Sequence, residues 1–580
     1  MPMENDRIVS VWHVEGDEIN QAQARRLAAD LGVAEPVGTL LINRGLETAE
    51  DAKTFMNPAL SAMHQPLLLP DMDVAIDRLS QAIANREALT VYGDYDVDGI
   101  TSTTLLVRFW ERLELQVDYY IPHRMEEGYG LHAESIRKLA DNGSRLLVCV
   151  DTGSTALAEA SLAHELGMEL IIIDHHRMAD ELPKAVAVVN PQREENQYPF
   201  KEMAAVGVTF NLLVALRARL IEQGVLQKGQ IDLRDDLDLV ALGTVADLVP
   251  LRDVNRIFTS VGLQRLTHAK RAGVLALKEA ARIRETVRAG QVAFFMAPRL
   301  NAGGRLSHAK QGVELFLSKD LNHARGIAEE LNSLNQQRQR VEQNAFKQAC
   351  AMLEGSDYLK SLSVIVLASP EWHPGVVGIV ASRMVERYQK PAFLIALDED
   401  DVGKASGRSV KGIDVHEALK AASAHLVRFG GHAMAAGFTI ERHKIDTFRE
   451  DLAAAVQNQT GGDYVPTRFV RVDMMLSPEH LNDALMADIS QLEPFGMGNP
   501  QPVFAVDNVY VVSSEIRGGQ HLKFQLSINN RRFSAMGFRM ARHGILKPGS
   551  VMKMAYQASY NTFQGIRSID LRIKDFVLKT

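Results

Sequence analysis

Three short apolar runs, each followed within two residues by an aspartate, constrain the fold of this chain more than any other feature. They are 88–92 (ALTVY), 145–150 (RLLVCV) and 170–173 (LIII). Continuously apolar runs are typical of parallel strands buried on both faces. Helix-like stretches at 100–115 and 155–166 separate them, and this alternation predicts an α/β fold with a doubly wound, mostly parallel sheet. Since the carboxyl ends of such strands meet at one cleft, we expect the polar residues after the runs to share one site.

Downstream of this region the sequence changes character twice. Residues 318–355 are polar, helical in periodicity and free of proline, which predicts a long connecting helix. A smaller α/β segment follows, with strands near 363–367 and 392–396. Past Pro466 apolar and polar residues alternate, as in a small β-domain that closes into a barrel. A chain of 580 residues is too long for one core. The predicted parts are an N-terminal segment without an interpretable motif (1–50), the large sheet domain (51–317), the connecting helix (318–355), the smaller α/β domain (356–462) and the β-domain (463–580).

The composition is that of an ordinary globular protein. Hydrophobic residues make up 46% and charged residues 23% of the chain, so packed cores are expected. The only cysteines, Cys149 and Cys350, predict neither a disulfide framework nor a cysteine zinc site, which fits a reducing cytoplasm. The first residues lack the pattern of an export signal, and no segment offers the roughly 18 uncharged apolar residues that a membrane span needs.

The charge is unevenly distributed along the chain. The formal net charge is -8, which by itself disfavours a polyanionic partner. Residues 251–310, however, contain 12 Lys and Arg against 3 Asp and Glu. A local basic surface in an acidic protein can hold one polyanion while the rest avoids non-specific binding. The alternative, a solvated helical face, remains open.

Acidic and imidazole side chains gather after the predicted strands. The segment 93–102 (GDYDVDGITS) places three aspartates at alternate positions, and if the strand conformation persists their side chains point the same way. Converging anions repel one another unless cations neutralise them, and carboxylate oxygens suit Mg²⁺ or Mn²⁺. Imidazole groups shift the preference toward Mn²⁺ or a similar transition metal. The candidate ligands of two ions are Asp94, Asp96, Asp98, Asp151, the triplet Asp174-His175-His176, and Asp247, which follows another apolar run.

Each piece of this pattern has a simpler interpretation. An isolated DxDxD is more often a loop or a calcium-like site, an aspartate after a strand is usually a helix N-cap, and a histidine pair is usually on the surface. The recurrence of such groups at successive strand ends instead favours one metal site. We therefore expect a divalent-metal-dependent phosphoester hydrolase.

These residues resemble the DHH phosphoesterase superfamily, which is named after the triplet at 174–176. Its other motifs are similar to DYDVDG at 94–99, VDTG at 150–153 and the stretch that ends in Asp247. The glycine-rich motif of its companion DHHA1 domain resembles GGHAMAAGF at 430–438. Within the superfamily the chain looks most like the bacterial single-strand-specific 5′-to-3′ DNA exonucleases, from about Phe55 to the C-terminus. Their further motifs are similar to 299–305 (RLNAGGR), 372–375 (WHPG), 406–408 (SGR) and 494–500 (PFGMGNP).

The resemblance implies two divalent cations, Mn²⁺ or Mg²⁺, with Asp151 as their bridge. Such a pair lowers the pKa of a bound water and stabilises an in-line displacement at phosphorus. The sequence leaves open which of the two histidines is a ligand and which faces the substrate phosphate. The implied metal ligands are Asp94, Asp96, Asp98, Asp151, His175 and Asp247. The implied catalytic residues are Asp96, Asp98, Asp151, His175, His176 and Asp247.

The resemblance also implies a substrate, single-stranded DNA degraded from its 5′ end to 5′-mononucleotides. Because the planar fork of arginine matches phosphate oxygens, Arg408 with Ser406 is the first candidate for a terminal phosphate pocket. Further implied substrate contacts are Arg124, Arg299, Arg305 and His432. A surface ion pair for Arg124 and a simple turn position for His432 are the open alternatives.

The predicted β-domain resembles an OB-fold, a module that binds single strands through basic grooves and aromatic stacking. The candidate stacking residues are Tyr510, Phe524, Phe533 and Tyr560. At least two of them are expected in the core, since aromatic residues of alternating strands usually pack inward. A ring-like enclosure of the strand by the domains is our hypothesis for single-strand selectivity.

Two rival functions remain open at this point. One is a DHH phosphodiesterase for short oligonucleotides or cyclic dinucleotides, which would not need the β-domain. The other is a DHH-like DNA-binding scaffold without catalysis, which the intact aspartates and histidines disfavour. We expect a cytoplasmic monomer. Resemblance alone implies roles in recombination, mismatch repair and base-excision repair, with single-strand-binding protein and a RecQ-type helicase as partners.

Overall fold

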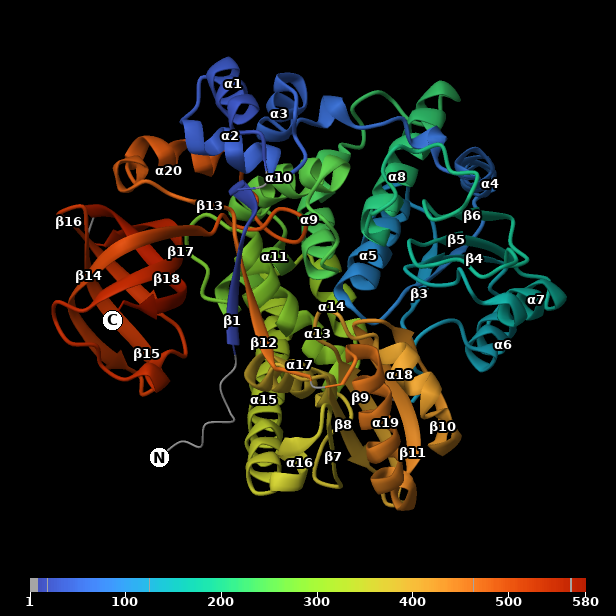
Figure 1. Ribbon diagram of the computed structural model, residues 1–580. Helices are drawn as coiled ribbons and strands as arrows, with labels where there is room; N and C mark the ends of the chain where they lie inside the picture. Colours follow the sequence, from blue (N-terminus) through green and yellow to red (C-terminus); the bar gives the residue numbers. More distant parts are fainter. Residues whose placement is uncertain (1–8, 18, 125, 463, 564–565, 580) are drawn as a thin grey trace. The chain divides into compact units, whose positions relative to one another are not determined.

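The computed structural model describes residues 9–17, 19–124, 126–462, 464–563 and 566–579 (Figure 1). The first eight residues of the predicted N-terminal segment and Asp463, where the predicted β-domain begins, lie outside these ranges. The chain divides into two compact units. Of the described residues, 9–11, 305–308 and 330–469 belong to the smaller unit, and 12–304, 309–329 and 470–579 belong to the larger one. None of the described helices has an apolar stretch long enough to cross a lipid bilayer.

A five-stranded parallel sheet, in the order β3-β2-β4-β5-β6, organises the first half of the larger unit. The central strands are buried at nearly every position, which explains their continuously apolar sequences. The chain winds outward in opposite directions from the neighbouring strands β2 and β4, so the predicted doubly wound sheet is confirmed, with its switch point between them. The strands are β2 (Leu89–Tyr92), β3 (Val117–Tyr120), β4 (Leu146–Val150), β5 (Glu169–Ile173) and β6 (Ala187–Val189).

Helices cover both faces of this sheet (Figure 1). One layer consists of α4 (Met72–Asn85), α5 (Val97–Arg112) and α8 (Ala205–Glu222), and the other of α6 (Ala133–Asp141) and α7 (Leu157–Glu165). Helix α9 (Leu237–Ala246) packs against α5, and both are buried almost all round. The helices that follow are α10 (Asp253–Thr267), α11 (Ala272–Ala280), α12 (Ala289–Gln291), a π-helical turn (Val292–Met296), α13 (Ala297–Leu306) and α14 (Lys310–Leu317).

The basic segment 251–310 is only in part a surface. Arg256 is 1% exposed and donates to the backbone carbonyls of Phe55 and Glu493. Lys278 is buried and donates to the backbone carbonyls of Leu266 and Thr267. The Arg271 guanidinium is also buried, in ion pairs with two aspartates. These three cations hold helices together because a buried charge needs partners. The remaining basic residues are at least partly exposed.

Helix α15 (Leu321–Glu354), 34 residues long, confirms the predicted connecting helix. It leads into the smaller unit, where a mixed sheet has the order β10-β11-β9-β8-β7. Successive residues of β7 face two separate cores. Val366 packs with α18 and α19, and Ile365 packs with α15 and α17. The elements are α16 (Asp357–Ser361), β7 (Ile365–Ser369), α17 (Val377–Tyr388), β8 (Ala392–Leu397), β9 (Val402–Arg408), α18 (Val415–Ala421), β10 (Leu426–His432), β11 (Ala435–Glu441) and α19 (Ile445–Thr460).

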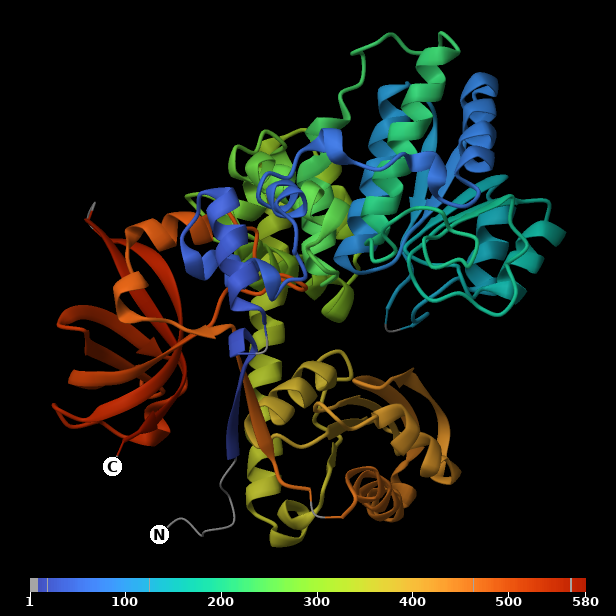
Figure 2. The same cartoon turned by 45° about the horizontal axis from the view of Figure 1, so that its top comes forward.

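The C-terminal strands of the larger unit close into a five-stranded barrel, which confirms the expected OB-like fold (Figure 2). Pairing of β14 with β17 completes the circle, and β16 runs parallel to β18. Phe524 and Phe533 are core residues, whereas Tyr510 is half exposed and Tyr560 lies under the Arg567 guanidinium. At least two of the four candidate stacking residues are therefore internal, as expected. The elements are β12 (Thr467–Val472), β13 (Met474–Met475), α20 (Asp483–Ser490), β14 (Phe504–Arg517), β15 (His521–Ile528), β16 (Arg531–Gly537), β17 (Val551–Phe563) and β18 (Ile566–Leu578).

The N-terminal helices, for which the sequence offers no interpretation, belong to the core of the barrel region. Leu27, Val37 and Leu40 pack in one apolar cluster with residues of α20 and the barrel, such as Leu485 and Phe504. Both views show α1 and α2 beside α20 (Figures 1 and 2). The elements are β1 (Val9–Val14), which pairs with β12, and α1 (Gln21–Leu31), α2 (Glu35–Ile42) and α3 (Ala49–Met56).

Candidate active site

The first three aspartates converge, but not because a strand continues through them. β2 ends at Tyr92, and Asp96 is the N-cap of α5, where its carboxylate accepts hydrogen bonds from the backbone N–H groups of Asp98 and Gly99 at 2.8 and 3.2 Å. Asp98 lies in the first turn of that helix. The expectation of strand alternation is therefore wrong, and the strand-to-helix turn is what gathers the carboxylates.

Asp98 is fixed by a second helix. Its two oxygens accept hydrogen bonds from the backbone N–H groups of Ala205 and Val206, at 2.6 and 2.9 Å, at the start of α8. A helix N-terminus stabilises a negative charge placed there. The carboxylate is 1% exposed, so its position is set by the packing of α5 against α8.

Asp151 stands at the carboxyl end of β4, on the other side of the switch point. Its backbone has a positive φ of 62°, and its N–H donates to the carbonyl of Ile173. The side chain is 2% exposed, and its Oδ1 atom has no hydrogen-bond partner among the described residues. An aspartate tolerates the left-handed conformation better than most residues, which lets the chain turn a charged side chain into the site.

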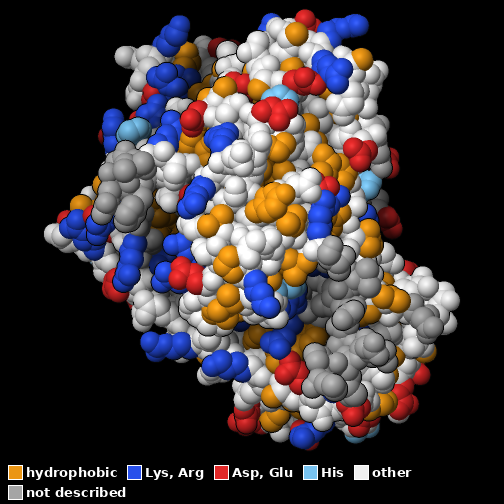
Figure 3. All heavy atoms as spheres, turned by 60° about the vertical axis from the view of Figure 1, so that its left-hand side comes forward, with side chains coloured by type: hydrophobic (Ala, Val, Ile, Leu, Met, Phe, Trp, Pro, Cys, Tyr) orange, Lys and Arg blue, Asp and Glu red, His pale blue; other side chains and the backbone are white. Residues whose placement is uncertain are grey.

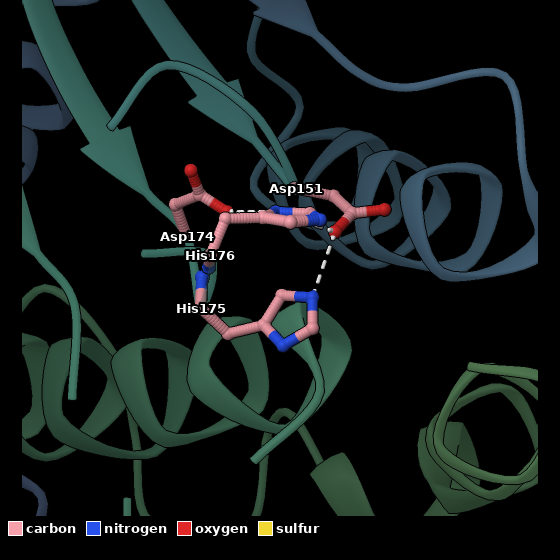
Figure 4. A group of neighbouring side chains, drawn as sticks. All are labelled: Asp151, Asp174, His175 and His176. Carbon is pink, nitrogen blue, oxygen red and sulfur yellow. Dashed lines mark hydrogen bonds and ion pairs between the residues drawn. The ribbon is translucent and has the colours of Figure 1, made fainter. Parts of the chain in front are cut away.

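The three residues after β5 make different contacts, which the sequence does not reveal. Asp174 is buried and accepts from the backbone N–H groups of His175 and His176 and from the His176 ring Nδ1 at 2.8 Å. The Nε2 atom of His175 instead lies 3.3 Å from Asp151 Oδ1 (Figure 4). Asp174 thus orients His176 and leaves His175 directed at the other carboxylates.

Asp247 completes the cluster from an unexpected element. The apolar run before it is helix α9, not a strand, and Asp247 is the C-cap of that helix. A short, continuously apolar run does not distinguish a buried strand from a buried helix. Asp247 Oδ2 lies 3.6 Å from His175 Nε2, and Asp98 Oδ2 lies 3.9 Å from the same nitrogen.

The donor set fits divalent cations. Potential ligand atoms lie within 4.8 Å of one another in three groups: Asp94, Asp96 and Asp151; Asp98, His175 and Asp247; and Asp151 with the triplet at 174–176. Within the described chain, four buried ligand atoms lack any hydrogen-bond partner: Asp94 Oδ1, Asp151 Oδ1, His175 Nε2 and Asp247 Oδ2. Buried polar atoms without partners are rare and need an explanation such as a bound ion. Asp151 belongs to two of the three groups, which suits a bridging ligand.

The raised pKa values of the clustered carboxyl groups also indicate a cation site. Burial, followed by the charge of Asp96, raises the pKa of Asp94 to about 8 and of Asp98 to about 7. Burial and then the charge of Asp98 raise the pKa of Asp247 to about 9. Burial, again followed by the charge of Asp98, raises the pKa of Asp151 well above its usual range. Carboxylates in this state hold protons until a cation replaces them.

The two histidines differ in how readily their rings take up a second proton. Burial and the neighbouring His176 lower the pKa of His175 to about 4, so its ring is neutral and can donate a lone pair to a metal. Burial acts against the charge of His176 as well, but the hydrogen bond and charge of Asp174 raise its pKa. His176 is therefore the member of the pair that holds a second proton more readily.

Sequence reasoning missed the role of one member of the site and the presence of another. It includes Asp174 among the candidate ligands, but not as the partner that orients His176. The hydroxyl of Tyr129 lies 3.1 Å from His176 Nδ1 and donates to the backbone carbonyl of Asp151 at 3.3 Å. The only signal for Tyr129 is its place between two glycines, Gly128 and Gly130, both with positive φ.

The predicted substrate contacts fall into the two units. In the larger unit the Arg124 guanidinium lies over the Tyr95 ring, 4.7 Å from its centroid, and its charge acts on Asp94. This places Arg124 beside the acidic cluster. Arg299 lies in α13 and donates to the carbonyl of Phe295.

The other predicted contacts lie in the smaller unit. Arg408 and Ser406 are in β9, where an Arg408 Nη1 atom donates to Ser406 Oγ at 3.1 Å. Arg305 donates to the carbonyl of Gly375 at 2.8 Å. His432, the last residue of β10, is exposed opposite Ala435 on β11.

Comparison with known proteins assigns the parts of the chain. Residues 88–244 match the model of the DHH family, N-terminal domain, residues 361–458 that of the DHHA1 domain, and residues 472–575 that of the RecJ OB domain. The chain is 36% identical to the single-stranded-DNA-specific exonuclease RecJ of Bacillus subtilis, over 97% of this chain and 70% of that protein. Identity to the Escherichia coli protein of the same name is 33%, over 95% and 98% of the two chains.

Solved structures of RecJ proteins have a similar fold. RecJ of Thermus thermophilus in complex with Mn²⁺ superimposes with a TM-score of 0.83 at 30% identity, covering 99% of this chain and 80% of that one. The same protein in complex with Mg²⁺ gives a TM-score of 0.77 at 29% identity, covering 98% and 78%.

Proposed function

Since the chain belongs to the RecJ family of DHH phosphoesterases, we propose that it is a metal-dependent exonuclease of single-stranded DNA that acts in recombination and repair. We further propose that it works from the 5′ end and releases 5′-mononucleotides. The single observation that carries the proposal is the convergence of buried, unpartnered carboxylate and imidazole atoms from four separate segments of the chain.

The proposed metal ligands are the six predicted from the sequence: Asp94, Asp96, Asp98, Asp151, His175 and Asp247. Two cations bound there supply an activated water and neutralise the charge that develops on the phosphoryl oxygens. The protein prepares this site by holding the carboxylates rigidly, through the α5 N-cap and the α8 N-terminus. A rigid, water-poor site needs little reorganisation during the reaction.

His176 is proposed as the group that meets the substrate. Its ring is 43% exposed, against 13% for His175, so it can reach a phosphate while still bonded to Asp174. A cationic imidazole held by a carboxylate can donate a hydrogen bond to a non-bridging oxygen or a proton to the leaving oxygen.

For the 5′ end we propose a phosphate pocket around Arg408 and Ser406. Burial lowers the pKa of Arg408, which marks a guanidinium partly withdrawn from water, where its attraction for an anion is stronger. A Cβ atom on Gly378 would come within 2.8 Å of Ser406 Oγ and 3.3 Å of Arg408 Nη2. The lack of a side chain at Gly378 thus leaves room for a ligand at these two groups. Arg124, Arg299, Arg305 and His432 remain proposed contacts along the strand.

The barrel supports a substrate longer than a dinucleotide. Residues 504–579 contain 12 Lys and Arg against 4 Asp and Glu, so this part of an acidic protein is basic. Figure 3 turns the barrel side toward the viewer and shows Lys and Arg side chains gathered on one half of that face. A basic OB-like barrel suits a single-stranded polyanion and has no use in hydrolysing a dinucleotide.

The test compares one long oligonucleotide labelled at either end, with Mn²⁺ present or chelated. The proposal expects metal-dependent release of labelled mononucleotide from the 5′-labelled strand at once, and from the 3′-labelled strand only at the end. Release of the 3′ label first would overturn the direction. Cleavage of dinucleotides alone would favour the phosphodiesterase alternative.

We also propose, on family resemblance alone, a cytoplasmic monomer that acts in mismatch and base-excision repair together with single-strand-binding protein and a RecQ-type helicase. In this proposal residues 51–317 carry out catalysis, residues 356–462 recognise the 5′ end, and residues 463–580 bind the strand.

A further inference from the structure

Two adjacent phenylalanines of the larger unit point into solvent. Phe294 is 78% exposed, more than any other large hydrophobic side chain in the described residues, and Phe295 is 49% exposed. Their neighbours Val292 and Met296 are fully buried and anchor the same turn. An exposed aromatic pair on a well-anchored turn is typical of an interaction site.

The backbone of this turn is unusual. Residues 292–296 form a π-helical turn inside an otherwise continuous helix, with the N–H of Ala297 bonded to the carbonyl of Val292, five residues back. Pro298 follows, and a proline ring conflicts with the carbonyl four residues earlier, here that of Phe294. The widened turn relieves this conflict. π-Helical turns are rare and frequent at functional sites.

Two arginines accompany the pair. Arg299, one turn further along, donates to the carbonyl of Phe295, which ties its guanidinium to the turn. Burial and then the charge of Arg282 lower the pKa of Arg299, while the charge of Glu329 acts in the opposite direction. Both arginines belong to the segment 251–310, with 12 basic and 3 acidic residues. Guanidinium groups beside an exposed aromatic pair suit the phosphates of a nucleic acid strand.

We propose that Phe294 and Phe295 form a stacking platform for the bases of single-stranded DNA, with Arg282 and Arg299 holding the phosphates beside it. Aromatic faces next to cations are the arrangement that binds single strands without regard to sequence. A protein partner could pack against any apolar side chain at positions 294 and 295. A stacked base needs the flat face of an aromatic ring. This inference rests on the proposed function and adds a base-binding site outside the metal cluster and the barrel.

The test measures binding of a fluorescent single-stranded oligodeoxynucleotide to the full-length protein in chelator, where no cleavage occurs. Phe294→Ala is expected to weaken binding roughly 5- to 100-fold, the range for one base stacked on an aromatic ring. Phe294→Tyr should restore it, and Phe294→Leu should not. Val225→Ala, at a valine 45% exposed in the same unit, is the matched control and should bind like the wild type.

A strand with abasic positions separates stacking from charge. Scanned along the oligonucleotide, an abasic substitution at the stacked position should weaken binding to the wild type but not to Phe294→Ala. Equal binding by Phe294→Ala and Val225→Ala, or full rescue by leucine, would overturn the inference. If the wild type neither binds nor degrades single strands, the proposed function itself fails. If it does both and the Phe294 variants match it, only the platform is refuted.

Discussion

Asp174 accepts a hydrogen bond from the ring of His176 at 2.8 Å and makes none with the ring of its other neighbour, His175. One carboxylate thereby gives two adjacent histidines different tasks. His175 stays neutral and faces the carboxylates, whereas the pKa of His176 is raised and its ring is partly exposed. This difference favours, on physical grounds, one of the two assignments that the sequence leaves open, and it can be tested.

Asp174→Asn should leave metal binding largely intact and slow the chemical step. The amide keeps the shape but removes the charge that raises the pKa of His176, so we expect kcat to fall about 10- to 100-fold, the usual cost of losing an orienting partner. Steady-state kinetics and Mn²⁺ calorimetry measure the two effects. Asp180→Asn, an exposed aspartate four residues after His176, is the control. A loss confined to metal affinity would contradict this role.

Asp151→Asn should abolish Mn²⁺ binding and activity together. Asparagine also tolerates the positive φ at this position, so the backbone is preserved. Because a buried carboxyl with a raised pKa destabilises the metal-free fold above the unfolded-state pKa, the metal-free variant should unfold at the same or a higher temperature than the wild type. Calorimetry, a nuclease assay and thermal unfolding report these outcomes. Asp118→Asn, exposed on β3, should change none of them. A variant that still binds two ions would exclude Asp151 as the bridge.

The sequence predicted the fold well where local pattern decides it. Continuous apolar runs predicted β2, β4 and β5, and alternation predicted the barrel strands. The sequence also predicted which residues meet at the site but misjudged how. Asp96 is held by the N-cap of α5, whereas strand alternation was expected there. Asp247 is held by the end of helix α9, and a short apolar run does not distinguish a buried strand from a buried helix. The role of Tyr129 could not be foreseen, since it depends on contacts across the fold.

Asp236 is predicted to carry much of the stability of the larger unit. Its carboxylate is buried among Arg108, Arg112 and Arg271. Burial opposes the charge, but these arginines, Arg112 first, lower the pKa of Asp236 below its usual value. Asp236→Asn removes the charge that pairs with the partly buried Arg108 and Arg112, while Arg271 keeps its pair with Asp238, and should cost about 3 kcal/mol of unfolding free energy. Chemical denaturation measures this cost.

The pH dependence follows from the sign of that shift. A lowered carboxyl pKa stabilises the fold above the unfolded-state pKa, and the benefit is lost as pH falls through the folded-state pKa. The wild type should therefore lose more stability on acidification than Asp236→Asn does. Asp232→Asn removes a more exposed pair with Arg234, which solvent screens, and should cost less than Asp236→Asn does. Equal costs at the two sites would contradict the argument.

Arg408→Lys should weaken the preference for a 5′-phosphorylated strand. Lysine keeps the charge but loses the planar fork that matches phosphate oxygens. We expect KM for the 5′-phosphorylated oligonucleotide to rise about tenfold, as one charge-assisted contact would give, while KM for the 5′-hydroxyl strand changes little. Arg442→Lys, exposed in the same unit, is the control. An equal rise for both strands would place Arg408 away from the terminal phosphate.

Gly99→Ala should inactivate the protein through the backbone. A Cβ atom at Gly99 would lie 2.5 to 2.7 Å from backbone atoms of Asp94, a distance that forces the acidic turn apart. Loss of Mn²⁺ binding is the expected result. Gly290→Ala meets no atom within 4 Å in a helix and should stabilise the protein by up to about 1 kcal/mol. Normal metal binding by Gly99→Ala would refute the steric argument.

The packing of α1 and α2 with the barrel has a consequence for how the protein is made. Leu27 and Val37 leave the ribosome hundreds of residues before Leu485 and Phe504, the residues that bury them. The indole N–H of Trp12 is separated even further along the chain from its acceptor, Asp575. Contacts so distant along the chain form late and leave apolar surface open in the meantime. Helices α1 and α2 are thus synthesised long before they can finish folding, and their apolar faces stay uncovered until the barrel forms.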